Sequence, residues 1–338
     1  MKNLNISIII LNWNGWKDTI ECLESIYQMD YPYFNVIVVD NKSEDDSIDK
    51  IRAFCEGKIN VSSKYFRYDI STKPININYY NTKTNKLKKN SSFHDNLNLY
   101  LIKNSENSGF AEGNNIGIRF SIKFLNPKYT LLLNNDTVVD KKFLNEMIVI
   151  ATQSNSGIIG PKILFYENEK IIQSLGTKIN WFSGKVKHIG YRSEDQEHVQ
   201  IPQDLDGISG CAMLIKKEVF DEIDLFDPQY YLYYEDNDLC IRAKRKGFVI
   251  ETSQNSKVWH KDSSSSQNNG IREYYSSRNH FLFMKIYANQ LQYSCFLIYY
   301  FCFKFWLDLL IIIIHHKNPQ MVTPYIKGVS KGLLIKHR

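Results

Sequence analysis

Two amides and one acid stand at the end of an apolar segment with the composition of a buried strand. Asn134, Asn135 and Asp136 directly follow Leu131–Leu133. A carboxylate together with amide oxygens suits a hard divalent cation, either Mg²⁺ or Mn²⁺, which could also hold a diphosphate. The same residue types favour turns. The triplet therefore indicates either a divalent-cation site or a simple turn at a strand end.

A second acidic cluster follows the tyrosine-rich stretch Tyr230–Tyr234. Glu235, Asp236 and Asp238 place three carboxylates within four residues. Asp238 lies four residues before Arg242, so the two can pair on one helix face, and negative charge is favourable at a helix start. Crowding also raises the pKa of one carboxyl group, which suits a general base.

Two further features lie at expected strand and helix ends. Asp40 closes the predicted strand Val36–Val39, and the glycine-rich stretch from Gly109 to Gly117 begins a predicted helix. Ligands of open parallel sheets bind beyond the carboxyl ends of the strands, where an acid can accept a hydrogen bond from a base or a ribose hydroxyl. Glycines at a helix start let backbone N–H groups approach a phosphate or a sugar. The alternatives are an Asx turn at Asp40 and tight helix–sheet packing at the glycines.

One histidine could extend the first site. His260 follows Trp259 after a predicted strand. A lone histidine is more often structural than a ligand, but this one could complete a metal site with Asp136.

Short apolar runs alternate with helical patterns along most of the chain. Such alternation predicts an α/β fold whose central sheet is mostly parallel and flanked by helices, because parallel strands need helical crossovers. Strands are expected at 6–11, 36–39, 99–102, 129–133, 158–163, 212–215 and 248–251. Helices are expected at 16–30, from the turn after residue 43 to about 55, and at 109–124, 141–152, 217–223 and 235–246.

The sequence divides into two regions of unequal length. Residues 1–285 carry the alternating pattern and form a predicted α/β domain, and 286–338 form a predicted C-terminal helical region. Within the first region, residues 58–98 are rich in Asn and Lys and show little periodicity. We therefore expect an insertion or a long surface loop there.

The C-terminal region contains a long apolar run over residues 291–314, interrupted by Lys304 and Asp308. Its length could span a bilayer. A charged pair four residues apart favours an amphipathic helix that lies on a membrane surface instead. A buried core helix is the alternative, although buried helices rarely stay apolar over this length.

Composition restricts the class of protein. The chain has 338 residues, 43% of them hydrophobic and 23% charged, as in globular proteins. A net charge of +6 suits a membrane surface or a phosphate-bearing ligand and does not indicate nucleic acid. The six cysteines lack metal-site spacing, which predicts reduced thiols in a cytosolic chain. The first apolar run, Ile6–Leu11, is too short for a secretory signal, so we expect it to start the fold.

Taken together, these motifs form an ordered set: an acid-ended strand, a glycine-rich helix start, an Asn-Asn-Asp strand end, an acidic helix and a late histidine. In this order the chain resembles the family 2 glycosyltransferases, in particular their rhamnosyltransferase-like branch. The resemblance runs from about residue 5 to 285 without 58–98. The matching stretches are Ser7–Gly15, Val38–Ser43, Gly109–Gly117, Leu131–Val139 and Gly207–Gly247.

The resemblance implies the nucleotide-diphospho-sugar transferase fold, called GT-A, and a role for each matching residue. Asp236 matches the catalytic base of the family's ED motif, with Glu235 beside it. Asp136 matches the metal-binding last acid of the DxD motif, where Asn134 stands in place of a frequent Asp, and His260 matches a late metal-binding histidine. Asp40 matches the acid that contacts the pyrimidine base. Further substrate contacts are expected at Asn12, Asn14, Asn41, Gly109, Gly113, Asn114, Asn134, Asn135, Asp238 and Arg242.

The same resemblance implies an activity. We expect an inverting glycosyltransferase that uses a divalent cation, Mg²⁺ or Mn²⁺, and a dTDP-rhamnose-like or UDP-sugar donor. The acceptor would be a glycan or lipid-linked glycan of cell-surface polysaccharide synthesis, reached from the cytoplasmic face of the membrane. One alternative is a nucleotidyltransferase that makes the activated sugar, but its glycine-rich basic loop is missing from Asn12–Trp16. The other is a non-catalytic, membrane-bound protein that binds a sugar nucleotide.

Overall fold

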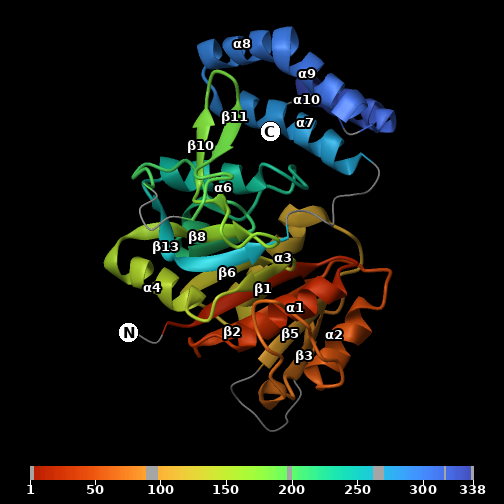
Figure 1. The fold of residues 1–338 in the computed structure, drawn as a ribbon, viewed down its shortest axis with the longest axis vertical. Helices are drawn as coiled ribbons and strands as arrows, with labels where there is room; N and C mark the ends of the chain where they lie inside the picture. The colour runs from red at the N-terminus through yellow and green to blue at the C-terminus, as the bar shows by residue number, and fades with distance from the viewer. Residues whose placement is uncertain (1–3, 89–97, 196–199, 262–269, 316, 336–338) are drawn as a thin grey trace.

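A central β-sheet runs through the protein with helices on both faces, and a separate layer of C-terminal helices covers one end (Figure 1). The computed structural model describes residues 4–88, 98–195, 200–261, 270–315 and 317–335. Within them, the α/β fold expected from the alternating pattern is confirmed.

The first half of the chain supplies the parallel part of the central sheet and the helices that flank it. Its strands are β1 (Ile6–Asn12), β2 (Phe34–Asp40), β3 (Asn76–Asn81), β4 (Lys86–Lys88), β5 (Asn98–Lys103), β6 (Tyr129–Asn134), β7 (Thr137–Val139) and β8 (Ser156–Phe165). Its helices are α1 (Trp16–Tyr27), α2 (Ser47–Cys55), α3 (Gly109–Phe124) and α4 (Phe143–Gln153), with a 3-10 turn at Ile70–Thr72.

The second half adds short strands and then helices. The strands are β9 (Ile172–Ser174), β10 (Thr177–Asn180), β11 (Lys185–His188), β12 (Ala212–Lys216) and β13 (Val249–His260). The helices are α5 (Lys217–Ile223), α6 (Glu235–Arg245), α7 (Ile271–Tyr287), α8 (Gln290–Tyr299), α9 (Phe305–Leu310) and α10 (Val322–Leu334). Two π-helical segments, Tyr300–Lys304 and Ile311–His315, follow α8 and α9, and a 3-10 turn at Pro319–Met321 precedes α10.

The order of strands in the sheet is β4-β3-β5-β2-β1-β6-β12-β8-β13-β7, with β9 paired to β8. Pairing is parallel from β3 through β5, β2 and β1 to β6. Beyond β6, strand β12 runs antiparallel to both β6 and β8, and β13 runs parallel to β8 and antiparallel to β7. The carboxyl ends of β1, β2 and β6 therefore lie at one edge, where the sequence places its polar motifs.

Both faces of the sheet are buried, which explains why its strands are continuously apolar. Ile8 and Ile10 of β1 pack in a core that includes residues of α1, α2 and α4. Ile9 points to the other face, into a core shared with α3, α5 and α6. Successive side chains of a strand alternate between faces, so a single apolar run serves both cores.

Residues 58–98 differ from the expected insertion or long loop. Strand β3 lies within this segment and pairs in parallel with β5, while β4 forms the outer edge of the sheet. The prediction missed these strands because the Asn- and Lys-rich sequence dilutes their apolar pattern at an exposed sheet edge. Residues 89–97 of the predicted loop lie outside the described residues.

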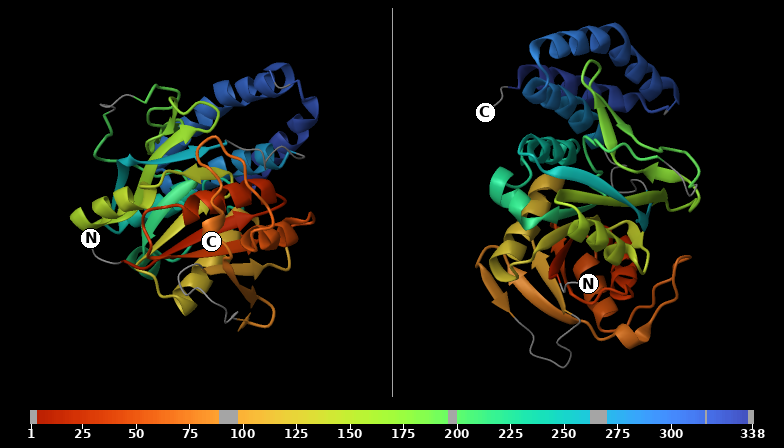
Figure 2. Two further views of the ribbon diagram at one scale, coloured as in Figure 1. Left: turned by 60° about the horizontal axis from the view of Figure 1, so that its bottom comes forward. Right: turned by 90° about the vertical axis from the view of Figure 1, so that its left-hand side faces the viewer.

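The C-terminal layer contains one long helix over Gln290–Ile314, whose length and apolar composition would suffice to cross a membrane. Only 11% of its most apolar window is buried, so the alternative of a buried core helix is wrong. The long helix lies beside α7 and α10 at one end of the molecule (Figure 2). Phe296, Tyr300 and Ile312 face inward and pack with residues of α7, α10 and the β10–β11 hairpin. Many of the apolar side chains on the other side are exposed, among them Leu291, Ile298, Phe303, Trp306 and Ile314.

A buried ion pair ties the segment before β3 to helix α1. Lys73 Nζ lies 2.7 Å from Glu24 Oε2, and both side chains are almost fully shielded from solvent. Glu24 also accepts hydrogen bonds from Gln28 Nε2 and from the backbone N–H of Asp69. The carboxylate is therefore satisfied only while this segment stays docked on α1.

Replacing Lys73 with Met should destabilise the protein by about 3–5 kcal/mol, because an uncompensated carboxylate would stay buried. Lys58→Met is the matched control, since Lys58 pairs with Glu56 on the surface and should contribute less than about 1 kcal/mol. Urea unfolding of both variants measures the difference. Equal stabilities would show that the Glu24 carboxylate does not depend on Lys73.

Candidate active site

A chain of polar contacts joins the carboxyl ends of β1, β2 and β6. Asn12 Nδ2 donates to Asp40 Oδ2 at 2.9 Å, and Asn12 Oδ1 accepts from Thr19 Oγ1 at 2.8 Å. Asn135 Nδ2 donates to Thr19 Oγ1 at 3.1 Å. Since Asn12 and Asp40 are fully buried, this chain fixes the strand ends relative to one another.

The turn expected at Asp40 is present. The carboxylate of Asp40 accepts a hydrogen bond from the backbone N–H of Ser43 at 3.1 Å. Asn14 Oδ1 accepts from the N–H of Glu44 at 2.7 Å, which closes the same loop from the β1 side. Both side chains shape the loop that follows β2. A direct contact of Asp40 with the pyrimidine base of a nucleotide stays a prediction.

Asn41 connects this loop to the start of α3. Its Nδ2 donates to the carbonyl of Gly109 at 3.1 Å, and its Oδ1 accepts from the N–H of Ser108 at 3.1 Å. A Cβ atom at Gly113 would lie 2.7 Å from Leu11, so tight helix–sheet packing accounts for this glycine. Asn114 is buried and donates to the Phe110 carbonyl one turn earlier.

Gly109 meets the tyrosine-rich loop that precedes α6. Its φ is +78°, and a Cβ atom there would lie 2.5 Å from the ring of Tyr231. The Tyr231 carbonyl accepts hydrogen bonds from the N–H groups of Phe110 and Ala111 at 2.7 and 3.1 Å. The Tyr231 ring stacks on Tyr275 of α7 with centroids 4.6 Å apart. The glycine therefore allows the loop to lie against the N-terminus of α3.

The backbone of this loop is held in an unusual conformation. Tyr231, Tyr233 and Tyr234 all have positive φ values, between 63° and 73°, which is costly for residues with bulky side chains. Asn279 of α7 is fully buried, and its Nδ2 lies 2.8 Å from each of the carbonyls of Tyr230, Leu232 and Tyr233. This one amide offsets part of the strain and fixes the loop from which Glu235 and Asp236 emerge.

Asp136 and His260 are brought together by strands from distant parts of the sequence. His260 is the last residue of β13 and pairs with Thr137 of β7, next to Asp136. Nε2 of His260 lies 3.2 Å from Oδ1 of Asp136, and its Nδ1 lies 2.8 Å from Oε1 of Gln173. Although burial acts in the opposite direction, His260 holds the pKa of the Asp136 carboxyl below its ordinary value. Burial likewise opposes the charge on His260, yet Cys211 and Asp136 raise the pKa of the imidazole well above its ordinary value.

The Asp136–His260 pair fits a divalent cation that is shared with a ligand. Oδ1 of Asp136 is buried and faces Nε2 of His260 at 3.2 Å, so a cation that displaced the imidazole proton would contact both atoms. Those residues contain no group of three or more His, Cys, Asp or Glu side chains placed to hold a metal. Two protein ligands leave coordination positions for the oxygens of a diphosphate.

Glu235 and Asp236 begin α6 and differ in their surroundings. Asp236 Oδ2 accepts a hydrogen bond from the N–H of Gly210 at 2.9 Å, and Oδ1 accepts from the N–H and Nδ2 of Asn237, both at 2.7 Å. Glu235 is buried, and its Oε2 has no hydrogen-bond partner among the described residues. Burial and the nearby Asp236 raise the pKa of the Glu235 carboxyl well above its ordinary value. Asp236 is therefore the better-oriented acceptor, and Glu235 resists ionisation.

Asp238 and Arg242 form the ion pair expected from their spacing. Arg242 Nη2 lies 2.7 Å from Asp238 Oδ2, and Tyr287 donates its hydroxyl to Asp238 Oδ1 at 2.5 Å. Arg242 also donates to the carbonyls of Ile223 and Leu225. These contacts occupy both side chains and tie α6 to its neighbours, and a substrate contact for either residue stays a prediction.

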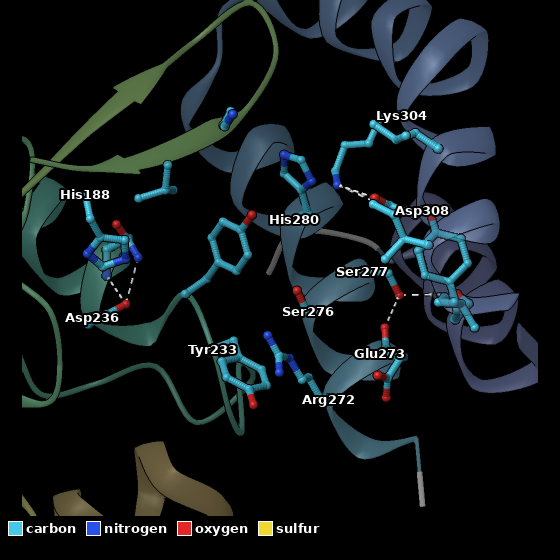
Figure 3. A pocket seen from close by; sticks show the side chains of 18 of the residues that line it. His188, Tyr233, Asp236, Arg272, Glu273, Ser276, Ser277, His280, Lys304 and Asp308 are labelled. Carbon is cyan, nitrogen blue, oxygen red and sulfur yellow. Dashed lines mark hydrogen bonds and ion pairs between the residues drawn. The ribbon is translucent and has the colours of Figure 1, made fainter. Parts of the chain in front are cut away.

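A large pocket of about 1270 Å³ opens beside these groups. Glu235, Asp236 and His260 are among the residues that line it, and Figure 3 shows Asp236 beside His188 on one wall. The β10–β11 hairpin, α7 and the long C-terminal helix supply much of the rest. This pocket is not lined by the sheet-edge residues Asn12, Asp40, Asn41 and Gly109. The site thus has two parts, namely the sheet edge at Asp40 and Gly109 and the pocket at Asp236, with the Asp136–His260 pair at their boundary.

Several residues of the site were not found from the sequence. Strand β7, which sets the register between Asp136 and His260, is only three residues long. Its β-branched sequence, Thr137-Val138-Val139, was the available signal. Gln173 and Asn279 carried no comparable signal, since single amides are common on surfaces.

Replacing Gly109 with Ala should weaken nucleotide binding and destabilise the protein. The new methyl group would push Tyr231 away in addition to straining the positive φ, for a total of about 2–4 kcal/mol. Gly247→Ala is the matched control, because Gly247 has a φ of +88° and open space around it, so only the conformational cost of about 1 kcal/mol applies. Thermal unfolding and nucleotide-binding calorimetry compare the two, and equal behaviour would contradict the role given to the Gly109–Tyr231 contact.

The models of two related protein families match this chain. The model of "Glycosyltransferase like family 2" matches residues 91–276, and that of "Glycosyl transferase family 2" matches residues 7–79. The low-salt glycan biosynthesis hexosyltransferase Agl10 of Haloferax volcanii is 31% identical over 158 residues, which is 46% of this chain and 50% of Agl10. The dTDP-rhamnosyl transferase RfbF of Shigella flexneri is 21% identical over 196 residues, 55% of this chain and 63% of RfbF. The chain thus spans half to somewhat under two thirds of the length of these relatives.

Solved structures share the fold at low identity. The mannosyltransferase PcManGT from Pyrobaculum calidifontis, in complex with GDP-Man and Mn²⁺, aligns with a TM-score of 0.56 at 13% identity, over 98% of this chain and 87% of that one. S. aureus TarS 1–349 in complex with UDP-GlcNAc aligns with a TM-score of 0.54 at 15% identity, over 96% and 82% of the two chains. The expected GT-A fold is confirmed, and the chain belongs to glycosyltransferase family 2, with similarity to its rhamnosyltransferase-like members.

Proposed function

We propose that this protein is an inverting glycosyltransferase that moves a sugar from a nucleotide-diphosphate donor to an acceptor hydroxyl, with Asp236 as the base. The observation that carries the proposal is the shared pocket. Asp236, oriented by the Gly210 amide, lines the same pocket as His260, which contacts Asp136. A proton acceptor and a candidate diphosphate anchor thus belong to one site.

Asp136 and His260 would hold the divalent cation, Mg²⁺ or Mn²⁺. When bound, the cation would offset the negative charge of the departing nucleoside diphosphate. The support is the buried carboxylate oxygen of Asp136, which faces Nε2 of His260 at 3.2 Å, together with the Mn²⁺ present in the PcManGT complex.

The protein's own groups account for the proton transfer. Asp236 takes the proton from the acceptor hydroxyl at its carboxylate, which the Gly210 and Asn237 N–H groups keep oriented. The acceptor oxygen then attacks the anomeric carbon from the face opposite the leaving group, so one displacement inverts the configuration. The logic matches that of inverting glycosidases, where a carboxylate base also acts on the opposite face.

The donor and acceptor are proposed by class. A dTDP-rhamnose-like or UDP-sugar donor is supported by RfbF, a dTDP-rhamnosyl transferase, and by TarS in complex with UDP-GlcNAc. A glycan or lipid-linked glycan acceptor is supported by Agl10, a glycan biosynthesis hexosyltransferase. The Asp40 and Gly109 edge would hold the nucleotide, because it lies outside the pocket that contains the proposed base.

Two other functions have less support from the sequence and the structure. A nucleotidyltransferase would need a glycine-rich basic loop after β1, and residues Asn12–Trp16 contain one glycine and no basic side chain. A non-catalytic nucleotide-sugar sensor would not need Asp236 held between backbone donors inside a pocket. Release of nucleoside diphosphate in a screen of nucleotide sugars, with and without Mn²⁺, separates the enzyme from the sensor.

Asp236→Asn should keep donor affinity and lower the transfer rate by about 10²–10⁴-fold, because it keeps the shape but removes the proton acceptor. Glu235→Gln is the matched control and should reduce transfer much less, since Glu235 is buried and resists ionisation. Single-turnover rates and calorimetry of donor binding measure both effects. A Glu235→Gln variant that binds donor normally but cannot transfer would identify Glu235 as the base instead.

Asp136→Ala should abolish metal-dependent nucleotide binding and turnover, because the principal anionic ligand is lost. Calorimetric titration of the nucleoside diphosphate with and without Mn²⁺ provides a readout that does not depend on catalysis. Asp140, which is half-buried and directly follows β7, offers Asp140→Ala as a control for general effects on this region. Binding that still depends on Mn²⁺ in Asp136→Ala would place the cation elsewhere.

The long C-terminal helix would hold the enzyme on the cytoplasmic face of a membrane. The inward stripe of Phe296, Tyr300 and Ile312 runs along the helix and packs on the C-terminal core, so the helix lies against the protein and exposes its other side. Washing membranes with alkaline carbonate should therefore release the protein. Retention in the pellet would mean that residues 290–314 span the bilayer instead.

A further inference from the structure

Two charged residues interrupt the long apolar helix of the C-terminal layer. Lys304 and Asp308 are the only Asp, Glu, Lys or Arg residues between Gln290 and Ile314. In apolar helices that contact a membrane, charged side chains usually face a cavity or another polar group instead of the lipid. Both side chains line the pocket that also contains Asp236.

These two residues belong to a polar network on the inner side of the helix. Lys304 Nζ donates to Asp308 Oδ1 and Oδ2 at 3.0 and 2.8 Å, and Tyr325 of α10 donates its hydroxyl to Asp308 Oδ2 at 3.0 Å. The Tyr300 and Tyr325 hydroxyls are 2.9 Å apart. An ammonium group carries three donors and a carboxylate about four acceptor positions. The described contacts therefore leave hydrogen-bonding capacity on both Lys304 and Asp308.

The network lies across the pocket from the proposed base. Figure 3 shows Asp236 on one side of the pocket and the Lys304–Asp308 pair on the other, with His280 between them. The nucleotide-side residues Asp40 and Gly109 do not line this pocket. The space between Asp236 and Asp308 thus extends away from the donor's nucleotide and is available to the molecule that receives the sugar.

We propose that the Lys304–Asp308 end of the pocket is a subsite that binds sugar hydroxyls of the acceptor. The proposal rests on the function proposed above, because it assigns the pocket to the acceptor. Paired donors and acceptors suit hydroxyl groups, which both donate and accept. Half-buried tyrosines that line the same pocket, among them Tyr233 and Tyr299, have apolar ring surfaces that can cover the C–H faces of a sugar.

A role limited to joining helices is the competing explanation. Tyr325 does link Asp308 to α10, so the pair also braces the layer. The side chains of Lys304 and Asp308 nevertheless keep 31% and 23% of their surface exposed, on the wall of the pocket. Two residues that only braced the helices could be fully enclosed, whereas a binding wall must stay accessible.

Binding of octyl glycosides to the full-length protein tests the subsite without any nucleotide donor. The probes carry rhamnose, glucose, galactose, mannose or N-acetylglucosamine, and saturation-transfer NMR identifies the protons that contact the protein. At least one probe should show transfer to its sugar-ring protons. Asp308→Asn should weaken that binding by about tenfold or more, as expected for the loss of a hydrogen bond to a charged group.

Asp221→Asn is the matched control, because Lys217 and Asp221 form the same i,i+4 pair on α5, outside the pocket. It should bind the glycoside as the wild-type protein does. If Asp308→Asn fails to fold, Lys304→Gln provides the same test on the neighbouring side chain. Unchanged ring-proton binding in the folded variant, contact through the octyl chain alone, or binding by none of the probes would overturn the proposal.

The outcome stays distinguishable from failure of the proposed function. Absence of nucleotide-sugar turnover in the wild-type protein would refute the proposed transferase activity. The glycoside-binding measurement could still be interpreted, because it uses no nucleotide donor. Conversely, the protein could release nucleoside diphosphate and yet bind the glycoside equally well as wild type and as Asp308→Asn. That result would support the transferase activity and refute the acceptor subsite.

Discussion

The contact between Asp136 and His260 depends on strand pairing that joins the middle of the α/β domain to its last strand. Strand β7 follows Asp136 directly, and its antiparallel pairing with β13 places His260 opposite Thr137. The same β13 runs in parallel beside β8, which fixes its position in the sheet. If β13 slipped by one residue, His260 would point to the other face of the sheet and the pair would be lost. The candidate metal site is therefore a consequence of sheet register.

A second constraint sets the position of the acidic helix. The tyrosine-rich loop adopts left-handed backbone conformations that are unfavourable in isolation. It is stabilised from both sides, by the N-terminus of α3 through Phe110 and Ala111 and by Asn279 of α7. Since α7 continues into the C-terminal layer, that layer contributes to the geometry around Asp236 as well as to the surface of the protein.

Much of the α/β core followed from the sequence because its signals are local. Continuous apolar runs identified the buried strands β1, β2, β5 and β6, and α3 and α5 have the predicted bounds. Strand β3 escaped because it lies near the sheet edge among polar residues, and β7 and β9 because they are three residues long. The full length of β13 was missed too, since its polar middle, Ser253–Lys257, coincides with an irregularity in its pairing with β8.

The candidate site was predictable in its motifs and not in its contacts. Asp136, Glu235 and Asp236 follow from residue type and position, whereas Gln173 and Asn279 act through tertiary contacts that no spacing reveals. The sequence indicated the turn at Asp40 and the Asp238–Arg242 pair, but not the further hydrogen bonds that Asn12 donates to Asp40 and Tyr287 donates to Asp238. Long-range packing decides whether a polar side chain faces a ligand or another part of the chain.

The most direct measurement is a crystal structure with a nucleoside diphosphate and Mn²⁺, using anomalous scattering to locate the metal. We expect an anomalous peak between the carboxylate of Asp136 and the diphosphate, with the nucleoside at the Asp40 and Gly109 edge and the pocket beside Asp236 left open for an acceptor. A nucleotide whose base occupies the pocket beside Asp236, or a diphosphate bound with the metal away from Asp136, would contradict this expectation.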